Sequence, residues 1–269
     1  MPLKFKPKKE LGQVFLKNEK IKEKMLKSMS LNKEDVVLEI GAGKGELTCE
    51  IAKLAKFVYA VELDPILCKM LEEEVNSFQN IKILNEDILN IDLEDIYKEC
   101  GSQILVVGNI PFSISTPLLL KLVEERRFIK ESYLTFQKEV ALKLKARHNS
   151  KEYGFLACYF NVFCDIEILF FIGRRNFTPP PKVDSAFLHF KFYKEPKFFL
   201  KSEKMYLKFL RICFNQRRKK IKNVLKKFIC EKELTRILKE LSLNENVRSE
   251  QIPLEKYPEF FNLCFDFLK

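Results

Sequence analysis

The sequence lacks several features that would assign it to a class of protein. No apolar run is long enough to cross a membrane, and the basic amino terminus is not followed by the apolar stretch and cleavage site of a signal peptide. Histidine occurs only at positions 148 and 189, and none of the eight cysteines forms a C-x-x-C pair. These absences argue against a zinc site, and scattered cysteines are typical of core residues in a reducing compartment. The sequence therefore predicts a cytoplasmic protein without a metal.

Acidic residues are scarce between positions 197 and 232. Only Glu203 and Glu231 occur there, against thirteen lysines and arginines, in a chain whose net charge is +11 at pH 7. A lysine-rich composition would explain the surplus of positive charge but not the exclusion of acids. The distribution favours a surface that binds a polyanion such as nucleic acid. The residues expected to contact RNA phosphates are Arg217, Arg218, Lys219, Lys220 and Lys222.

Short apolar runs alternate with helical segments over the first 140 residues. Strands are expected at 36–40, 57–61, 81–84, 104–108 and 133–136, and helices at about 19–29 and 46–54, after Asp64-Pro65 and after Thr116-Pro117. This alternation predicts an α/β protein with a doubly wound, Rossmann-like, mostly parallel sheet. Aromatic-rich segments at 159–172 and 186–192 have nothing helical between them, and we expect them to close the sheet as an antiparallel pair.

The composition of the chain shifts near residues 194–197. Beyond this point apolar residues recur at helical spacing, including Leu210, Phe214, Ile221, Leu225 and Phe228, which would form the stripe of a helix. On that helix either residue 217 or residue 218 would fall in the gap of the stripe. We therefore predict a first domain at 1–195 and a small, basic, helical domain at 196–269.

Glycines follow the first expected strand in the pattern G-x-G-x-G, at Gly41, Gly43 and Gly45. Glycine lets a backbone turn sharply and approach a ligand closely, and no Lys-Ser/Thr follows that would indicate a P-loop. Glu62 ends the second strand, where a carboxylate can accept both ribose hydroxyls. Asp87 ends the third, where it can accept a hydrogen bond from an adenine amine. A plain glycine turn is the alternative, but the two acids favour a nucleoside cofactor.

An amide, a proline and an aromatic follow the strand at 104–108, in the order Asn109-Ile110-Pro111-Phe112. A strand-ending turn is the simplest interpretation. Beside a nucleoside site, however, the Asn109 side chain and the Ile110 carbonyl can accept both N–H bonds of a nucleobase amine, while Phe112 stacks on the base. These acceptors direct the nitrogen lone pair toward a methyl donor. The pattern favours methyl transfer to an exocyclic amine, by positioning and electrostatics without a strong base.

Motifs along nearly the whole chain fall in the order of one known family. They are LGQVFL (11–16), EIGAGKGELT (39–48), VELD (61–64), NIPFSISTP (109–117), QKEVA (137–141), NSKEYG (149–154) and FTPPPKVDS (177–185). The chain resembles the small-subunit ribosomal RNA adenine dimethyltransferases, the KsgA group. The resemblance implies dependence on S-adenosylmethionine, a helical carboxyl-terminal domain, and N6-dimethylation of two adjacent adenosines near the 3′ end of 16S ribosomal RNA. It also implies a monomer that acts on the assembling subunit, away from membranes.

The resemblance also assigns roles to individual residues. The cofactor-contacting positions are Val14, Leu16, Gly41, Glu62, Asp87 and Asn109, beside Gly43 from the glycine pattern. Phe177 falls on an aromatic position that borders the base pocket. Two residues depart from the family pattern. Val14 replaces the usual His or Asn, so a side-chain polar contact is not expected there. Phe112 replaces Tyr, which keeps the stacking face and loses the hydroxyl.

Three alternative functions have to be compared with this interpretation. The erythromycin-resistance branch modifies a large-subunit adenine with the same type of site, but the segment CFNQRRKKIKN (213–223) resembles the small-subunit group. A non-catalytic RNA-binding or transcription factor on the same fold would not need an intact Asn109 motif. A DNA adenine methyltransferase would have no use for the basic helical segment.

Overall fold

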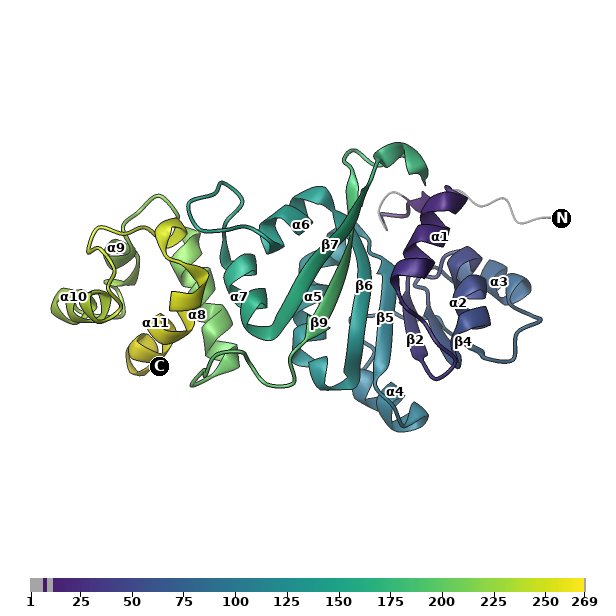
Figure 1. Ribbon diagram of the computed structural model, residues 1–269, viewed down its shortest axis with the longest axis horizontal. Coiled ribbons are helices and arrows are strands. Elements are labelled where there is room, and N and C mark those ends of the chain that lie inside the picture. The colour runs from purple at the N-terminus through teal and green to yellow at the C-terminus, as the bar shows by residue number, and fades with distance from the viewer. Residues whose placement is uncertain (1–6, 9–11, 269) are drawn as a thin grey trace. The chain divides into compact units, whose positions relative to one another are not determined.

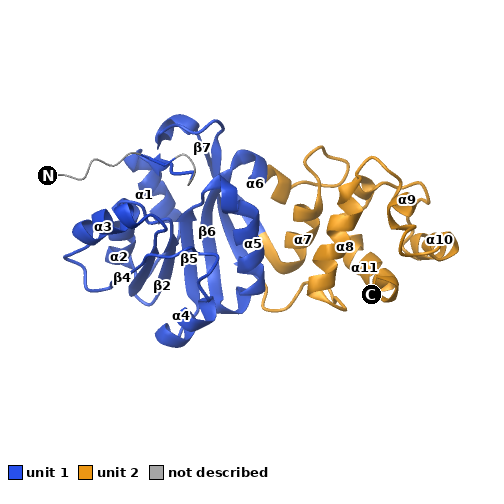
Figure 2. Ribbon diagram, turned by 180° about the vertical axis from the view of Figure 1, so that it is seen from behind, with its two compact units in different colours: residues 1–141, 166–192 blue, residues 142–165, 193–269 orange. Residues whose placement is uncertain are grey.

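The computed structural model describes residues 7–8 and 12–268, which form two compact units (Figure 2). Unit 1 comprises the described residues of 1–141 together with 166–192, and unit 2 comprises 142–165 and 193–268. Leu11 of the first motif and most of the basic amino terminus lie outside the described residues. None of the helices in the described part of the chain combines the length and hydrophobicity that a membrane crossing requires.

A seven-stranded sheet with the order β4-β3-β2-β5-β6-β9-β7 organises unit 1 (Figure 1). Its strands are β2 (Val36–Ile40), β3 (Phe57–Val61), β4 (Ile81–Leu84), β5 (Ile104–Asn109), β6 (Ile129–Gln137), β7 (Cys164–Ile172) and β9 (Ser185–Phe192). The first five strands in this order run parallel, and β9 is antiparallel to β6. A second sheet pairs β1 (Phe15–Leu16) with β8 (Phe177–Thr178). The predicted Rossmann-like fold is confirmed.

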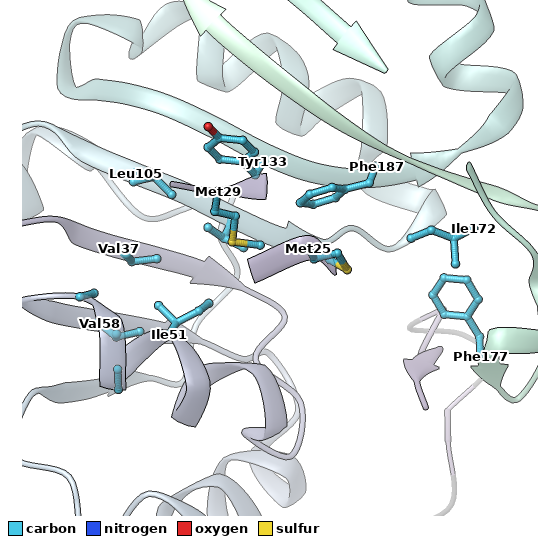
Figure 3. Close-up of a cluster of buried hydrophobic side chains, with 13 residues drawn as sticks. Met25, Met29, Val37, Ile51, Val58, Leu105, Tyr133, Ile172, Phe177 and Phe187 are labelled. Carbon is cyan, nitrogen blue, oxygen red and sulfur yellow. The ribbon is translucent and has the colours of Figure 1, made fainter. Parts of the chain in front are cut away.

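Helices cover both faces of this sheet because strands that are buried on both sides need two apolar layers. The helices that begin in unit 1 are α1 (Glu19–Ser28), α2 (Glu46–Leu54), α3 (Pro65–Glu74), α4 (Leu93–Cys100), α5 (Ser115–Glu124) and α6 (Lys138–Leu144). Met25 of α1 and Ile51 of α2 pack with Val37, Leu105 and Phe187 of the sheet (Figure 3). Helix α5 lies over the opposite face (Figures 1 and 2). The strands therefore end at fixed positions between two packed layers.

Several helix starts follow directly from the sequence. Asp64 caps α3 by accepting a hydrogen bond from the Ile66 amide at 3.0 Å, and Pro65 occupies the first helical position, where its missing N–H costs nothing. Asn18 caps α1 through the amide of Ile21. The predicted strand bounds 36–40, 57–61 and 81–84 agree with the structure.

The expected strand at 159–172 is partly wrong. Its first five residues belong to α7 (Phe155–Phe163), and only Cys164–Ile172 forms β7. Helix α7 is buried on nearly every side, so its sequence shows no amphipathic period, and such a run cannot be distinguished from a buried strand by pattern alone. Because α7 packs against α8 (Glu203–Asn215), residues 142–165 belong to unit 2. The predicted first domain at 1–195 thus differs from unit 1 chiefly by this segment.

Unit 2 is helical, as expected, but its central helix is shorter than the apolar spacing predicts. Besides α7 and α8 it contains α9 (Ile221–Leu225), α10 (Glu231–Glu240) and α11 (Tyr257–Cys264). Helix α8 ends at Asn215, and a turn at 216–220 separates it from α9. The Ile221 amide there donates to the Val247 carbonyl at 2.8 Å, which draws the backbone toward a distant segment. Arg217 and Arg218 therefore lie in a turn, and Phe228 is 43% exposed rather than on a buried stripe.

Candidate active site

A cavity of about 290 Å³ opens at the carboxyl ends of the central strands of unit 1. Residues from the segment before α1, the glycine loop and the ends of β3 and β5 line it, among them Val14, Gly41, Gly43, Glu62, Asp87, Asn109 and Pro111. An adjacent hollow of about 80 Å³ shares five of these wall residues: Val14, Phe15, Gly41, Gly43 and Asn109. The structure thus brings together residues as far apart in the sequence as Gly12 and Ile114.

The glycine loop places backbone, not side chains, against the cavity. Gly41 and Gly43 adopt φ values of 73° and 61°, in the left-handed region that disfavours any residue with a Cβ. A Cβ on Gly43 would also lie 3.2 Å from the ring of Phe15. The amides of Gly41 and Ala42 both donate to the Val61 carbonyl, at 2.9 and 3.0 Å, which fastens the loop to the end of β3. The turn leaves room for a ligand beside bare backbone.

Glu62 is 7% exposed and lies on the cavity wall. Its Oε2 accepts a hydrogen bond from the Gly43 amide and its Oε1 accepts one from the Asp64 amide, both at 2.9 Å. Burial raises the pKa of the Glu62 carboxyl, and these two backbone donors oppose that rise. Each carboxylate oxygen keeps a second lone pair. Glu62 can therefore hold the glycine loop and still accept hydrogen bonds from a ligand.

Asp87 is half-buried at the far wall of the same cavity. Its Oδ1 accepts a hydrogen bond from the Leu89 amide at 2.9 Å in a local Asx turn. This contact fixes the side chain and leaves Oδ2 as an acceptor. The two acids predicted at strand ends thus line one cavity.

Asn109 ends β5 and lines both the cavity and the smaller hollow. Its Nδ2 donates a hydrogen bond to the Val14 carbonyl at 2.9 Å. The preceding Gly108 allows β5 to approach β2 closely, since a Cβ there would lie 2.7 Å from the Ile40 carbonyl oxygen. Because Nδ2 is committed to Val14, Oδ1 is the group that Asn109 offers as an acceptor.

The residues after Asn109 form a compact turn. The Ile110 amide donates to the Thr135 carbonyl at 3.1 Å, and the Ile110 side chain is buried. No hydrogen bond from the described residues reaches the Ile110 carbonyl. Pro111 lines the cavity, and half-buried Phe112 opens a short 3₁₀ turn, Phe112–Ile114. Neither Ile110 nor Phe112 is among the residues that line the two hollows.

Leu16 and Phe177 occupy opposite positions in the β1–β8 pair. Leu16 lines the smaller hollow, and its contact with the cofactor stays a prediction. Phe177 is 2% exposed and packs with Met25 and Ile172 in the core (Figure 3). The structure does not bring the Phe177 ring to either hollow, and its role at a base pocket stays a prediction.

Glu39, two residues before the first glycine of the loop, is a further polar group of this site. It lies in β2, is 3% exposed, and lines the smaller hollow, as does the hydroxyl-bearing Thr135. Its Oε2 and the Thr135 Oγ1 have no hydrogen-bond partner among the described residues. Burial raises the pKa of Glu39 to about 7, and the negative charge of Glu62 adds to this rise. An acid inside the apolar strand VVLEI was the signal that could have identified this group.

Three of the five predicted RNA-contacting residues line a separate hollow of about 650 Å³ in unit 2. Its lining includes Arg217, Arg218 and Lys219. Arg217 is partly engaged, because it donates to the Lys151 carbonyl and pairs with Glu250 at 3.2 Å. The two remaining candidates have partners outside the hollow. They are Lys220, which donates to Asn246, and Lys222, which pairs with Glu231 and Glu245. Arg218 and Lys219 have no side-chain partner among the described residues.

The known proteins that resemble this chain point to one family. The family model described as "Ribosomal RNA adenine dimethylase" matches residues 4–266. A protein named "Ribosomal RNA small subunit methyltransferase A", from Clostridium botulinum (strain Loch Maree / Type A3), is 35% identical over 265 residues, which cover 98% of this chain and 96% of that protein.

Two solved structures also align with nearly all of the chain. A dimethyladenosine transferase from Plasmodium falciparum has a TM-score of 0.79 at 26% identity, covering 93% of this chain and 98% of its own. The 23S rRNA methyltransferase ErmE has a TM-score of 0.71 at 25% identity, with 93% and 99% covered. The chain therefore belongs to the ribosomal RNA adenine dimethylase family.

Proposed function

We propose that this protein transfers methyl groups from S-adenosylmethionine to the N6 amines of two adjacent adenosines near the 3′ end of small-subunit ribosomal RNA. One observation carries the proposal beyond family membership. The Asn109 amide nitrogen is held by the Val14 carbonyl at the wall of the cavity, so the amide oxygen is the acceptor offered to an amine. We infer that the assembling small subunit is the substrate and that the enzyme acts in the cytoplasm as a monomer.

The cavity fits a nucleoside cofactor on three counts. The left-handed backbone at Gly41 and Gly43 gives a ligand access to main-chain atoms. Glu62, fixed by two backbone donors, would accept the ribose hydroxyls, and the free oxygen of Asp87 would accept the adenine amine. Val14 and Leu16 would contribute packing and backbone contacts. When bound, S-adenosylmethionine supplies an electrophilic methyl group.

The chain's own residues would orient the target amine. Asn109 Oδ1 and the Ile110 carbonyl would accept its two N–H bonds, which directs the nitrogen lone pair away from both acceptors. Pro111 limits the backbone conformations available to Ile110, which holds that carbonyl in place. Phe112, and Phe177 by family resemblance, would contact the base faces. Because the amine becomes more acidic as the methyl group arrives, positioning and electrostatic stabilisation would suffice.

The basic hollow of unit 2 would bind RNA phosphates. The best candidates are Arg218 and Lys219, whose charges no side chain of the described residues offsets. Arg217 would contribute less, because its guanidinium already donates to the Lys151 carbonyl and pairs with Glu250. Lys220 and Lys222 are weaker candidates than their sequence position indicates, since both already have partners.

The decisive experiment is to incubate the protein with labelled S-adenosylmethionine and ribosomal subunits that lack the modification, and to map the methylated nucleotides. We expect label on two adjacent small-subunit adenosines, with both N6 positions doubly methylated at completion. Label on a large-subunit adenine would instead assign the erythromycin-resistance type of activity. RNA binding without label on either subunit would favour a non-catalytic RNA-binding role.

A further inference from the structure

A three-residue polar cluster fastens the segment before α1 to the start of α3. Gln13 Nε2 donates to Asp64 Oδ2 at 2.9 Å, and Lys8 Nζ lies 3.0 Å from the same oxygen and 3.1 Å from Oδ1. The Lys8 amide in turn donates to Gln13 Oε1 at 2.7 Å. The Gln13 side-chain amide is thus satisfied at both ends. We call these three residues, Lys8, Gln13 and Asp64, the latch.

The latch is anchored at its Asp64 end. The Asp64 side chain is fully buried, and its Oδ1 also caps α3. Its backbone amide donates to Glu62 Oε1, and Glu62 Oε2 holds the Gly43 amide. One continuous set of hydrogen bonds therefore connects the latch to the proposed cofactor carboxylate and the glycine loop. Burial opposes ionisation of Asp64, but the hydrogen bonds donated by the Gln13 side chain and the Ile66 amide, together with the Lys8 ammonium, keep the pKa of this carboxyl below its ordinary value.

The segment that the latch holds also contacts the reacting end of the cavity. Gly12, Gln13, Val14 and Phe15 line the cavity, and the Val14 carbonyl accepts the hydrogen bond from Asn109 Nδ2. Val14 immediately follows Gln13 in the chain. A displacement of Gln13 would therefore also move the Val14 carbonyl. Among the described residues, this carbonyl is the only acceptor of a hydrogen bond from Asn109 Nδ2.

We propose that Gln13 is a positioning residue that, through the latch and the Val14 carbonyl, sets which end of the Asn109 amide faces the target amine. An asparagine amide presents an acceptor on one side and two donors on the other, and the two orientations occupy almost the same space. A carbonyl at the Val14 position accepts hydrogen bonds and cannot donate them. It selects the orientation with Nδ2 toward Val14 and Oδ1 toward the amine.

Loss of this selection would be costly for a specific reason. With the amide reversed, Asn109 would present N–H donors to the N–H donors of the adenine amine, so that neither group is satisfied. The inference rests on the proposed role of Asn109 and adds to it two residues, Lys8 and Gln13, that have no proposed contact with the target amine. It predicts an effect on the methyl-transfer step itself, beyond any effect on cofactor affinity.

The test compares Gln13→Ala with Gln103→Ala. Gln103 also donates its side-chain amide to backbone carbonyls, those of Arg127 and Ile129, but it precedes β5 at the end of the strand opposite Asn109. The readout is the single-turnover methylation rate at saturating S-adenosylmethionine and unmodified small subunits. We expect Gln13→Ala to lower this rate at least tenfold and Gln103→Ala to leave it within twofold, with similar melting temperatures. A rate for Gln13→Ala within twofold of wild type, accompanied only by weaker cofactor binding, would overturn the proposal.

A double variant shows whether the effect passes through Asn109. If Gln13 acts by orienting Asn109, then Gln13→Ala combined with Asn109→Ala should be no slower than Asn109→Ala alone. Multiplying losses would mean that Gln13 acts on another part of the site and would refute the proposal. Should Asn109→Ala itself retain near-normal turnover, the proposed function of Asn109 would fail independently of the latch.

Lys8 provides a second, milder perturbation in case Gln13→Ala destabilises the fold. Its side chain is 36% exposed, so we expect Lys8→Met to lower the saturated rate by about threefold and Lys8→Arg to restore it, because the guanidinium can still pair with Asp64. Failure of Lys8→Arg to exceed Lys8→Met would show that the charge of the latch does not matter for positioning.

Discussion

The cavity of unit 1 and the basic hollow of unit 2 are built in different ways. The cavity walls come from the ends of neighbouring parallel strands, so that Glu62, Asp87 and Asn109 meet because each follows a strand whose end is fixed by the sheet. The basic hollow surrounds a turn between two helices, and its shape depends on contacts to residues near 245–250. Strand ends place residues by topology, whereas a turn places them through long-range partners.

This difference sets how each region should respond to substitution. In the cavity each of the polar side chains Glu62, Asp87 and Asn109 is fixed by a hydrogen bond to the backbone, so changes there should alter chemistry or affinity in large steps. In the hollow several cations share one polyanion and some are already paired, so changes there should be graded.

The largest effect is expected for Asn109→Ala. Removing the side chain that orients the target amine should lower the single-turnover methylation rate by at least about a hundredfold, comparable to the loss of one oxyanion-hole donor, while cofactor affinity changes only modestly. Single-turnover assays with unmodified subunits and equilibrium titration of the cofactor measure the two effects. Asn90→Ala, at an exposed position of the same unit, serves as the control. Near-normal turnover of Asn109→Ala would show that Asn109 does not orient the target amine and that this part of the cavity is not the site of methyl transfer.

A pH-dependent effect on stability is expected from Glu39. Burial raises the pKa of this carboxyl from 4.5 to about 7, so between these values the folded state keeps a proton that the unfolded state has lost. The free energy of unfolding should then fall as the pH rises from about 4.5 to about 7, by roughly 3 kcal/mol at 1.36 kcal/mol per pKa unit. Replacement by Gln in Glu39→Gln should remove most of this slope.

Urea unfolding of the cofactor-free protein at pH 5 and pH 8 measures the slope, and Glu34→Gln at an exposed position is the control. Equal slopes in wild type and Glu39→Gln would mean that Glu39 is already compensated in the folded state. The cavity and the basic hollow would then differ less, because the buried Glu39 carboxyl would affect stability no more than a paired charge on the surface does.

The next effect concerns Glu62. In Glu62→Gln one side-chain atom becomes a donor, so either the Gly43 or the Asp64 amide loses its acceptor. We expect cofactor affinity to fall at least tenfold and the free energy of unfolding to fall by about 1–3 kcal/mol. Glu86→Gln, on the same cavity wall but exposed, should change both much less. Equilibrium titration and thermal unfolding distinguish the outcomes, and equal affinities for the two variants would refute a ribose contact at Glu62.

Much of the cavity was predictable because its determinants are local. The alternation of strands and helices, the glycines after β2 and the polar residues that end β3, β4 and β5 can all be read along the chain. The sequence could not predict the hydrogen bond between Gln13 and Asp64 or the one between Asn109 and Val14. These pairs are 51 and 95 positions apart, and a sequence pattern does not give side-chain geometry over such separations. The burial of Phe177 was missed for the same reason: it depends on Met25 and Ile172 from other elements.

The hollow of unit 2 was less predictable. Its positive charge could be predicted from the sequence. The helix, however, was expected to continue through residues 216–220, because the apolar residues before and after this turn have helical spacing. In the structure the helix ends at Asn215, and the turn pairs with the distant residues Val247 and Arg248. Lys220 and Lys222 likewise have partners 26 and 23 residues away, Asn246 and Glu245, and Lys222 also pairs with Glu231. Charge runs identify a surface, and tertiary contacts decide which of its charges are available.

A smaller effect is expected at Phe112. If its ring stacks on the target base, Phe112→Ala should lose about 1–3 kcal/mol of transition-state stabilisation, whereas Phe112→Tyr should stay close to wild type. The ratio of kcat to KM on small subunits measures both variants. Because Phe112 does not line the hollows in this structure, an unchanged value for Phe112→Ala would identify it as part of the turn alone.

The smallest and most graded effect is expected in the basic hollow. Replacing Arg218 and Lys219 with Gln should weaken RNA binding and flatten the dependence of log affinity on log salt by roughly 1 to 2 units, since each phosphate contact releases about one counterion.

The control is the matched double variant Lys220→Gln and Lys222→Gln, which removes the same formal charge. Those lysines already contact Asn246, Glu231 and Glu245, so the salt slope of this variant should change by less than about one unit. Binding is measured across a salt series with an RNA fragment that contains the target adenosines. Methylation rates at saturating RNA should be unaffected in both double variants, because neither pair lies in unit 1. Equal slopes for the two pairs would show that net charge alone governs binding, and that the partners of these lysines do not select which cations meet the RNA.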